Sequence, residues 1–174
     1  VIAEQCRAMQ LHIDHHIART RAQAMARTPG IRSDVGTIVA GVASALSRLH
    51  AGSGVAIDCD VQPGLYCALD GQDLNELLAN LVDNAFKFAK SRIVVHASKT
   101  NEATVRISIE DDGPGLPPEA HEVVFSPGAR LDESRSGTGL GLAIVRDLVE
   151  LYRGKIVLGQ SPLGGLLVQL WLPV

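Results

Sequence analysis

Two kinds of hydrophobic pattern succeed one another along the chain. Apolar residues three and four positions apart are typical of amphipathic helices, whereas apolar residues at every second position are typical of strands. These patterns predict helices over residues 1–28, 33–50, 73–89 and 139–151, and strands over residues 55–61, 92–97, 105–109, 155–159 and 166–172. An irregular stretch rich in glycine and proline covers residues 112–138. This order predicts an α+β fold, in which helices cover one face of a mixed sheet.

The first predicted helix differs from the others because its apolar stripe is narrow. Ile2, Met9, Ile13 and Ile17 follow one another at helical spacing, and the other faces of the helix are polar. Such a seam is typical of association between helices. Residues 28–30, Thr-Pro-Gly, end the helix. We therefore predict one associating helix in residues 1–30 and a separate domain in residues 31–174.

Composition and charge exclude several classes of function. The 174 residues include 16 basic and 19 acidic ones, a net charge of −3, which gives no reason to expect binding to nucleic acid or to an anionic membrane. No apolar stretch reaches the roughly 18 residues of a spanning helix, and no signal peptide is recognisable. Because the chain begins at Val1, we expect a fragment whose membrane connection lies upstream. Cys59 and Cys67, which have no metal-ligand spacing, are predicted to be buried thiols.

The predicted helix 73–89 gathers its polar side chains on one face. Successive residues of a helix are rotated by about 100° around its axis, and at this spacing the polar side chains fall within an arc of roughly 100°. A solvated face is one interpretation, but two asparagines on the stripe lower helix propensity without adding charge. Carboxamide and carboxylate oxygens suit Mg²⁺, which bridges phosphates. The residues of the stripe are Glu76, Asn80, Asp83, Asn84 and Lys87.

Two glycine-rich segments also have both a structural and a functional interpretation. Residues 110–115, Glu-Asp-Asp-Gly-Pro-Gly, follow a strand and form either a tight turn or the floor of a pocket for a flat ligand. Residues 137–142, Gly-Thr-Gly-Leu-Gly-Leu, open the helix 139–151, where free backbone amides can bind an anion. The second segment has neither the spacing of a dinucleotide fingerprint nor that of a P-loop.

Taken together, these segments resemble the nucleotide-binding boxes of the Bergerat-fold (GHKL, HATPase_c) ATPases, in the family order and over most of residues 34–174. Residues 80–87, Asn-Leu-Val-Asp-Asn-Ala-Phe-Lys, resemble the N box, and residues 111–115 the first glycine box. Phe125 resembles the F box, residues 137–142 the second glycine box, and residues 164–165 the turn before the last strand. Within this superfamily the chain is similar to the catalytic domain of sensor histidine kinases, those of the PhoQ type in particular.

The resemblance implies a two-layer α/β sandwich that holds ATP and Mg²⁺ between helix 73–89 and the loop 112–138. Asn80 would be the principal metal ligand, assisted by Asn84, and Lys87 would contact the phosphates. Glu76 takes the position of the water-activating carboxylate of hydrolysing members, or is a helix-surface residue. The residues implied to surround the adenine are Phe88, Asp111, Gly113 and Gly115, and those implied to surround the phosphates are Arg130, Arg135, Gly137, Thr138, Gly139, Leu140 and Gly141.

The histidine that would accept the phosphoryl group does not occur in its usual pattern. Residues 16–21, His-Ile-Ala-Arg-Thr-Arg, come nearest, but lack the acidic neighbour and the proline of the family's phosphoacceptor run. The resemblance thus implies that residues 1–30 are the second helix of a truncated dimerisation and phosphotransfer hairpin. It further implies a homodimer of the full-length protein through that hairpin, a response regulator as partner, and a cytoplasmic position in an inner-membrane sensor.

Three functions stay open at this point. The leading prediction is the catalytic domain of a two-component histidine kinase, which transfers the γ-phosphoryl group of ATP to a histidine outside the chain. A nucleotide-sensing or phosphotransfer module without turnover is disfavoured by the intact Asn80, Asp111 and glycine boxes. An ATPase that drives a conformational clamp is disfavoured by the short chain and its helical stalk.

Overall fold

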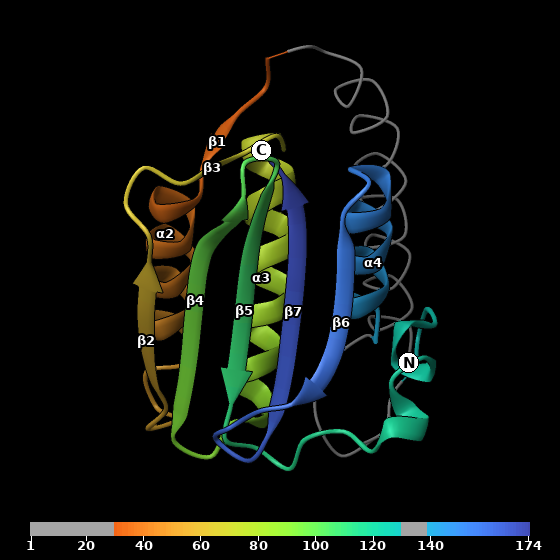
Figure 1. Cartoon of the computed structure of the whole chain (residues 1–174). Helices are drawn as coiled ribbons and strands as arrows, with labels where there is room; N and C mark the ends of the chain where they lie inside the picture. The colour runs from red at the N-terminus through yellow and green to blue at the C-terminus, as the bar shows by residue number, and fades with distance from the viewer. Residues whose placement is uncertain (1–29, 130–138) are drawn as a thin grey trace, which may run out of the picture.

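The structure is a computed structural model that describes residues 30–129 and 139–174. The predicted helix 1–28 and His16 lie outside these residues. Figure 1 shows the architecture, a sheet with helices on one face. The helices are α2 (Val35–Leu49), α3 (Gly71–Phe88) and α4 (Gly141–Leu151). The strands are β1 (Ser33–Asp34), β2 (Ala56–Val61), β3 (Tyr66–Cys67), β4 (Arg92–Asn101), β5 (Thr104–Asp111), β6 (Lys155–Gln160) and β7 (Leu166–Pro173), and the 3₁₀ turns are η1 (Pro118–Ala120) and η2 (Val123–Phe125).

The main sheet has five strands in the order β2-β4-β5-β7-β6. Strands β2 and β4 are parallel, because α3 crosses over between them, and the other pairs are antiparallel. Helices α2, α3 and α4 lie on the same face of the sheet (Figure 1). The predicted α+β class, with a mixed sheet and helices on one face, is therefore confirmed.

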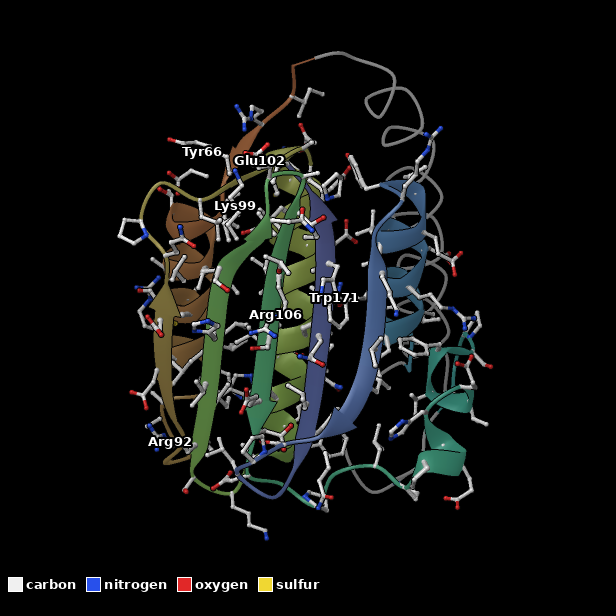
Figure 2. All side chains as sticks on the ribbon, viewed as in Figure 1. Tyr66, Arg92, Lys99, Glu102, Arg106 and Trp171 are labelled. Carbon is white, nitrogen blue, oxygen red and sulfur yellow. The ribbon has the colours of Figure 1, made fainter. Side chains whose placement is uncertain are left out.

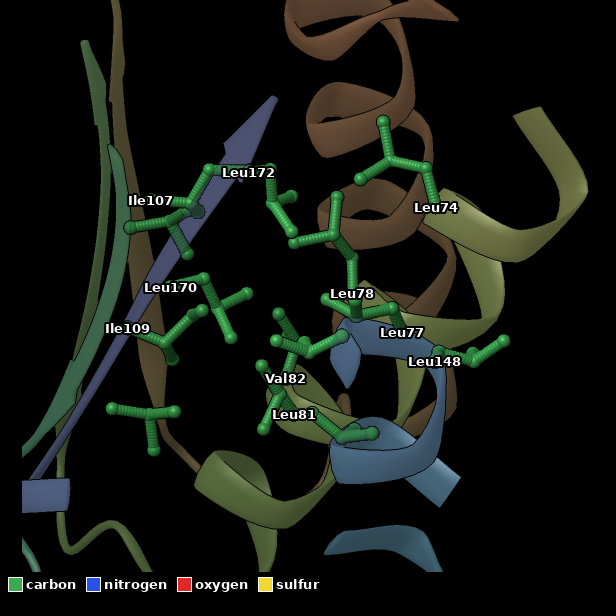
Figure 3. Packing of buried hydrophobic residues seen from close by; sticks show 14 of the residues in the cluster. Leu74, Leu77, Leu78, Leu81, Val82, Ile107, Ile109, Leu148, Leu170 and Leu172 are labelled. Atoms are coloured by element: carbon green, nitrogen blue, oxygen red, sulfur yellow. The ribbon is translucent and has the colours of Figure 1, made fainter. Parts of the chain in front are cut away.

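Helix α3 lies over the centre of the sheet and supplies much of the core. Its leucines Leu78 and Leu81 face Ile107 of β5 and Leu170 and Leu172 of β7 (Figure 3). All five side chains are buried, and each contributes about 1.5–3 kcal/mol through removal of its apolar surface from water. Because its apolar side is fixed in this way, α3 presents its polar stripe on the side away from the sheet.

Polar side chains fix the ends of the helices. Asp34 caps α2 by accepting from the Thr37 N–H at 2.7 Å, and Asp70 caps α3 by accepting from the Gln72 N–H at 2.9 Å. The Tyr152 hydroxyl, which follows α4, donates to the buried Asp73 carboxylate at the start of α3. The bond between Tyr152 and Asp73 joins the end of α4 to the start of α3.

Strands β1 and β3 were not predicted, because each has only two residues and shows no periodicity. The predicted burial of the two thiols was confirmed for Cys67 and wrong for Cys59. Cys67 is fully buried, and burial raises the pKa of its thiol to about 11. The prediction of a buried Cys59 was wrong: it is exposed because β2 is an edge strand with only β4 beside it.

The sheet face away from α3 carries charged and aromatic side chains. Arg106 of β5 and Trp171 of β7 are directly opposite each other there (Figure 2). None of the helices in residues 30–129 and 139–174 is both long enough and apolar enough to cross a membrane.

Candidate functional site

The polar stripe of α3 meets the first residue of α4. The Asn80 side-chain amide donates to the Glu76 carbonyl oxygen at 3.0 Å, which fixes its orientation. Its Oδ1 then points toward Gly141: a Cβ built on Gly141 would lie only 3.2 Å from it. The N-box helix and the glycine-opened helix therefore come together at Asn80. Glu76 and Asn84 lie half-buried on the same helix, one turn to either side.

The backbone around the start of α4 is tightly packed. Gly139 has a φ of +70°, and a Cβ there would lie 2.7 Å from the Ala129 carbonyl oxygen. The Gly128 N–H donates to the Gly139 carbonyl at 3.1 Å. Leu140 precedes the helix and, in the described part of the chain, no side chain caps it and no acidic residue stands in its first turn. The first-turn N–H groups of a helix are donors that can bind an anion.

Asp111 ends β5 in a buried corner with 4% of its surface exposed. Its Oδ1 accepts from the N–H groups of Gly113, at 2.8 Å, and Leu166, at 3.2 Å. Among the described residues, every hydrogen bond of this carboxylate falls on Oδ1, and no buried side-chain oxygen lacks a partner. Oδ2 therefore retains contact with solvent and can accept a hydrogen bond from a ligand.

Burial sets the proton affinity of the Asp111 carboxylate. Loss of solvent raises its pKa, the N–H groups of Gly113 and Leu166 lower it, and the charge of Asp112 raises it, with a net shift upward. Such a shift is common where a charged group is kept in a ligand site. Only above this raised pKa are both oxygens acceptors; below it, one of them carries a proton and becomes a donor.

Three glycines let backbone segments touch around Asp111. A Cβ on Gly113 would lie 2.5 Å from the Phe88 carbonyl oxygen, and one on Gly165 would lie 2.2 Å from Asp111 Oδ1. A Cβ on Gly115 would lie 3.2 Å from the Gly165 carbonyl. The corner therefore joins the end of α3, the loop after β5 and the turn before β7. Phe88 is eight residues beyond Asn80, about 12 Å along the helix.

Asp112, which the motifs did not single out, fixes this corner to the start of β4. Its carboxylate accepts from the N–H groups of Lys90, Ser91 and Arg92 at 2.8–3.2 Å, and from the Ser91 hydroxyl at 2.6 Å. Desolvation opposes ionisation, but the hydrogen bonds from Ser91 and its neighbours outweigh it and hold the pKa of Asp112 well below its usual range. No spacing rule in the sequence pairs residue 112 with residues 90–92.

We expect Asp112→Ala to lower the free energy of unfolding at pH 7 by about 1–2 kcal/mol, a range that already allows for partial solvent exposure. The folded-state pKa lies below the unfolded value of about 4, so this stabilisation is present above about pH 4 and is lost as the pH falls through the folded-state pKa. Urea unfolding of both proteins at pH 7 and pH 3 should show the difference shrinking at the lower pH. Asp60→Ala, at an exposed ion pair with His96, is the control and should change stability little.

The remaining predicted residues divide into two groups. Lys87 lies on the α3 stripe and pairs with Asp83, Phe88 is the last residue of α3, and Phe125 is buried in η2 beneath the Arg146 guanidinium. The other predicted phosphate contacts lie outside the described residues; they are Arg130, Arg135, Gly137 and Thr138.

The chain is similar to known proteins over most of its length. Residues 69–174 match the family described as Histidine kinase-, DNA gyrase B-, and HSP90-like ATPase. The chain is 37% identical over 174 residues to the sensor protein kinase CarS of Pseudomonas aeruginosa, covering all of the chain and 38% of that protein. It is 34% identical over 165 residues to the sensor protein PhoQ of Escherichia coli, covering 95% of the chain and 34% of that protein. The chain thus spans little more than a third of these relatives.

Solved structures share the fold. A mycobacterial sensor histidine kinase, MprB, superimposes with a TM-score of 0.74 at 25% identity, over 82% of this chain and 96% of that one. Full-length ShkA, solved in complex with AMPPNP, gives a TM-score of 0.70 at 26% identity, over 94% of this chain and 35% of that one. The ATP-binding domain of PrrB from Mycobacterium tuberculosis gives 0.67 at 26% identity, over 84% and 98%.

Proposed function

Because the chain belongs to the Histidine kinase-, DNA gyrase B-, and HSP90-like ATPase family, as an ATP-binding catalytic domain of the sensor histidine kinase type, we propose that it binds magnesium ATP and transfers the γ-phosphoryl group to a histidine outside this chain. The observation that carries the proposal is the proximity of Asn80 Oδ1 to Gly141, where an added Cβ would lie 3.2 Å from that oxygen. It brings an oxygen ligand of the N box against the start of the helix that would hold the phosphates.

The chemistry of the donors fits a magnesium ion. Because the Asn80 amide nitrogen is bound to the Glu76 carbonyl, its oxygen is the atom presented to the site, and amide oxygens are hard ligands that suit Mg²⁺. Asn84, one turn further on, would assist. Among the described residues, no group of three His, Cys, Asp or Glu side chains could hold a metal. The ion would therefore depend on these amides together with phosphate oxygens and water.

The corner around Asp111 fits the adenine ring. Asp111 Oδ2 would accept from the exocyclic amine, and Gly113 and Gly115 would let the backbone approach the flat ring. Phe88, at the end of α3, would form one wall. The base would then lie near the end of α3 and the phosphates near its middle, an arrangement that suits the extended shape of a nucleotide.

Phosphoryl transfer requires mainly alignment and stabilisation of charge on the phosphoryl oxygens. Bound magnesium would supply part of that positive charge. The backbone amides of Gly139, Leu140 and Gly141 would orient the phosphate chain, and Lys87 would contact its oxygens. The loop residues proposed to complete this shell are Arg130, Arg135, Gly137 and Thr138. The Glu76 side chain would lie beside the site, either polarising the incoming nucleophile or remaining a surface residue.

The partners follow from what the relatives are called. Both CarS and PhoQ are named sensor proteins, and we propose that the whole protein here is likewise a two-component sensor that passes phosphate to a response regulator. We further propose that residues 1–30 belong to a dimerisation hairpin, that the full-length protein is a homodimer through it, and that upstream segments connect this cytoplasmic domain to the inner membrane.

The test is a phosphotransfer assay. The chain is incubated with γ-labelled magnesium ATP, alone and with a separately produced hairpin carrying the phosphoacceptor histidine of a close relative. We expect acid-labile label on the added hairpin, and loss of that label by at least about 100-fold in Asn80→Ala, since removal of one group that stabilises transition-state charge costs about that much. Gly41→Ala, at an exposed position of α2 with open space around it, is the control and should transfer normally.

The alternatives give different products. Free phosphate without labelled hairpin would instead identify an ATPase, and binding without any product would identify a nucleotide-sensing module. Either result would contradict the proposal.

A further inference from the structure

His50, the residue that follows α2, contacts the polar face of α3 although it belongs to none of the motifs. Its Nε2 lies 2.9 Å from Oδ1 of Asp83. Its ring stacks on that of Phe86, with centroids 4.9 Å apart and planes within 3° of parallel. Because Phe86 is buried, the stacking holds the imidazole against the core of the domain.

Asp83 has a second partner on its other carboxylate oxygen. Lys87 Nζ lies 2.5 Å from Oδ2, one turn further along α3. Burial alone would raise the pKa of Asp83, but hydrogen bonds from Lys87 and His50 lower it below its usual value. The carboxylate is therefore ionised at neutral pH and accepts from both sides. The side chains of His50, Asp83 and Lys87 are 22%, 29% and 32% exposed, so solvent screens this set less than it screens an open surface pair.

We propose that His50 is a positioning residue for Lys87, acting through Asp83. By occupying Oδ1, the imidazole holds the carboxylate in the rotamer whose Oδ2 fixes the lysine ammonium beside the polar stripe of α3. The inference rests on the proposed function, in which Lys87 binds the phosphates of the nucleotide. It adds to that function the residue that directly follows α2, a part of the chain that contributes none of the nucleotide-binding motifs.

The geometry explains why such a support is useful. An ammonium carries three N–H donors, and in the proposed function Asp83 holds the group while it bonds to phosphate oxygens. A free lysine loses considerable rotamer entropy when it binds a ligand, and a lysine that is already held loses less. The chain of contacts from Phe86 to His50, Asp83 and Lys87 therefore transmits the rigidity of the core to the cation.

The test uses His50→Phe, which keeps a flat ring against Phe86 but removes the nitrogen that bonds to Asp83. Calorimetry would compare the affinities of the original chain and the variant for magnesium ATP and for adenosine, which lacks phosphates. We expect ATP affinity to fall about fivefold, the size of one partly exposed ionic interaction, with adenosine affinity unchanged. His96→Phe removes a similar histidine–aspartate bond, to Asp60 at 3.0 Å on the sheet, and should change neither affinity.

A double-mutant cycle provides the decisive measurement. In a Lys87→Ala background, His50→Phe should have no further effect on ATP affinity, because the residue it positions is gone. Three results would each overturn the inference: an additive effect in that background, an equal loss of affinity for ATP and adenosine, or no loss in His50→Phe alone. In all three cases, ATP binding by the original chain would leave the proposed function intact. Absence of ATP binding by the original chain would overturn both. If His50→Phe does not fold, Asp83→Ala in the same cycle gives the same expected result.

Discussion

Replacing Gly165 with alanine is expected to destabilise the domain by about 2–4 kcal/mol and to abolish ATP binding. The added Cβ would lie 2.2 Å from Asp111 Oδ1, 2.5 Å from the Gly113 nitrogen and 2.6 Å from the Asp111 carbonyl oxygen. Two of these atoms belong to the backbone, and the third accepts hydrogen bonds from two N–H groups. None of them can move without disrupting the hydrogen bonds around Asp111. Thermal unfolding and calorimetry with magnesium ATP would measure the two losses.

Gly41→Ala is the matched control for this substitution. Gly41 lies in α2, is exposed, and has no atom within 4 Å of the position of an added Cβ. Alanine there should stabilise the helix by about 0.5–1 kcal/mol and leave nucleotide binding unchanged. If Gly165→Ala melted at the same temperature as the original chain and bound ATP normally, the description of the Asp111 corner would be wrong.

The fold was largely predictable because long elements repeat their pattern several times. Helix α3 shows its leucine side clearly, and β4 and β5, joined by a two-residue turn, could hardly pair in any way other than antiparallel. The residues of the N box and the glycine boxes could be found because each lies in a short, ordered motif. The helical pattern also predicted that Asn80 lies on the polar face of α3, because the leucines occupy the opposite face.

What the sequence could not provide are contacts between residues far apart in the chain. Asp112 binds N–H groups about twenty positions earlier, and His50 reaches Asp83 from the end of α2. Neither follows from a period or a motif, because each depends on the packing of α2 and β4 against α3. The exposure of Cys59 has the same origin, since the alternation within β2 does not reveal that the strand lies at the edge of the sheet. Tertiary position thus decides the roles of isolated polar residues.

Asp111→Asn is expected to lower ATP affinity by about 100-fold, near 3 kcal/mol, without unfolding the domain. The asparagine oxygen must take the place of Oδ1, because the N–H groups of Gly113 and Leu166 both need an acceptor there. The amide NH₂ then replaces Oδ2 and presents donors to the adenine amine. Rotating the amide would instead place its NH₂ against two N–H groups, which is less favourable still.

Selectivity between bases and the pH dependence separate this role from a general structural one. Guanine presents a carbonyl oxygen where adenine presents an amine, so Asp111→Asn should lose far less affinity for GTP than for ATP; equal losses would contradict the assignment. In the original chain, ATP affinity should fall as the pH decreases through the raised pKa of Asp111, and the asparagine variant should lack this dependence.

The same raised pKa predicts the effect of Asp111→Asn on stability. A folded-state pKa above the unfolded value means that ionised Asp111 destabilises the fold at neutral pH, and that stability increases as protonation removes the charge. Asp111→Asn should therefore melt no lower than the original chain at pH 7 while binding ATP poorly. Urea unfolding at pH 7 would test this, and a clear loss of stability would indicate that the carboxylate serves the fold. The expected result means that the domain keeps a charge at a buried position because the ligand needs an acceptor there.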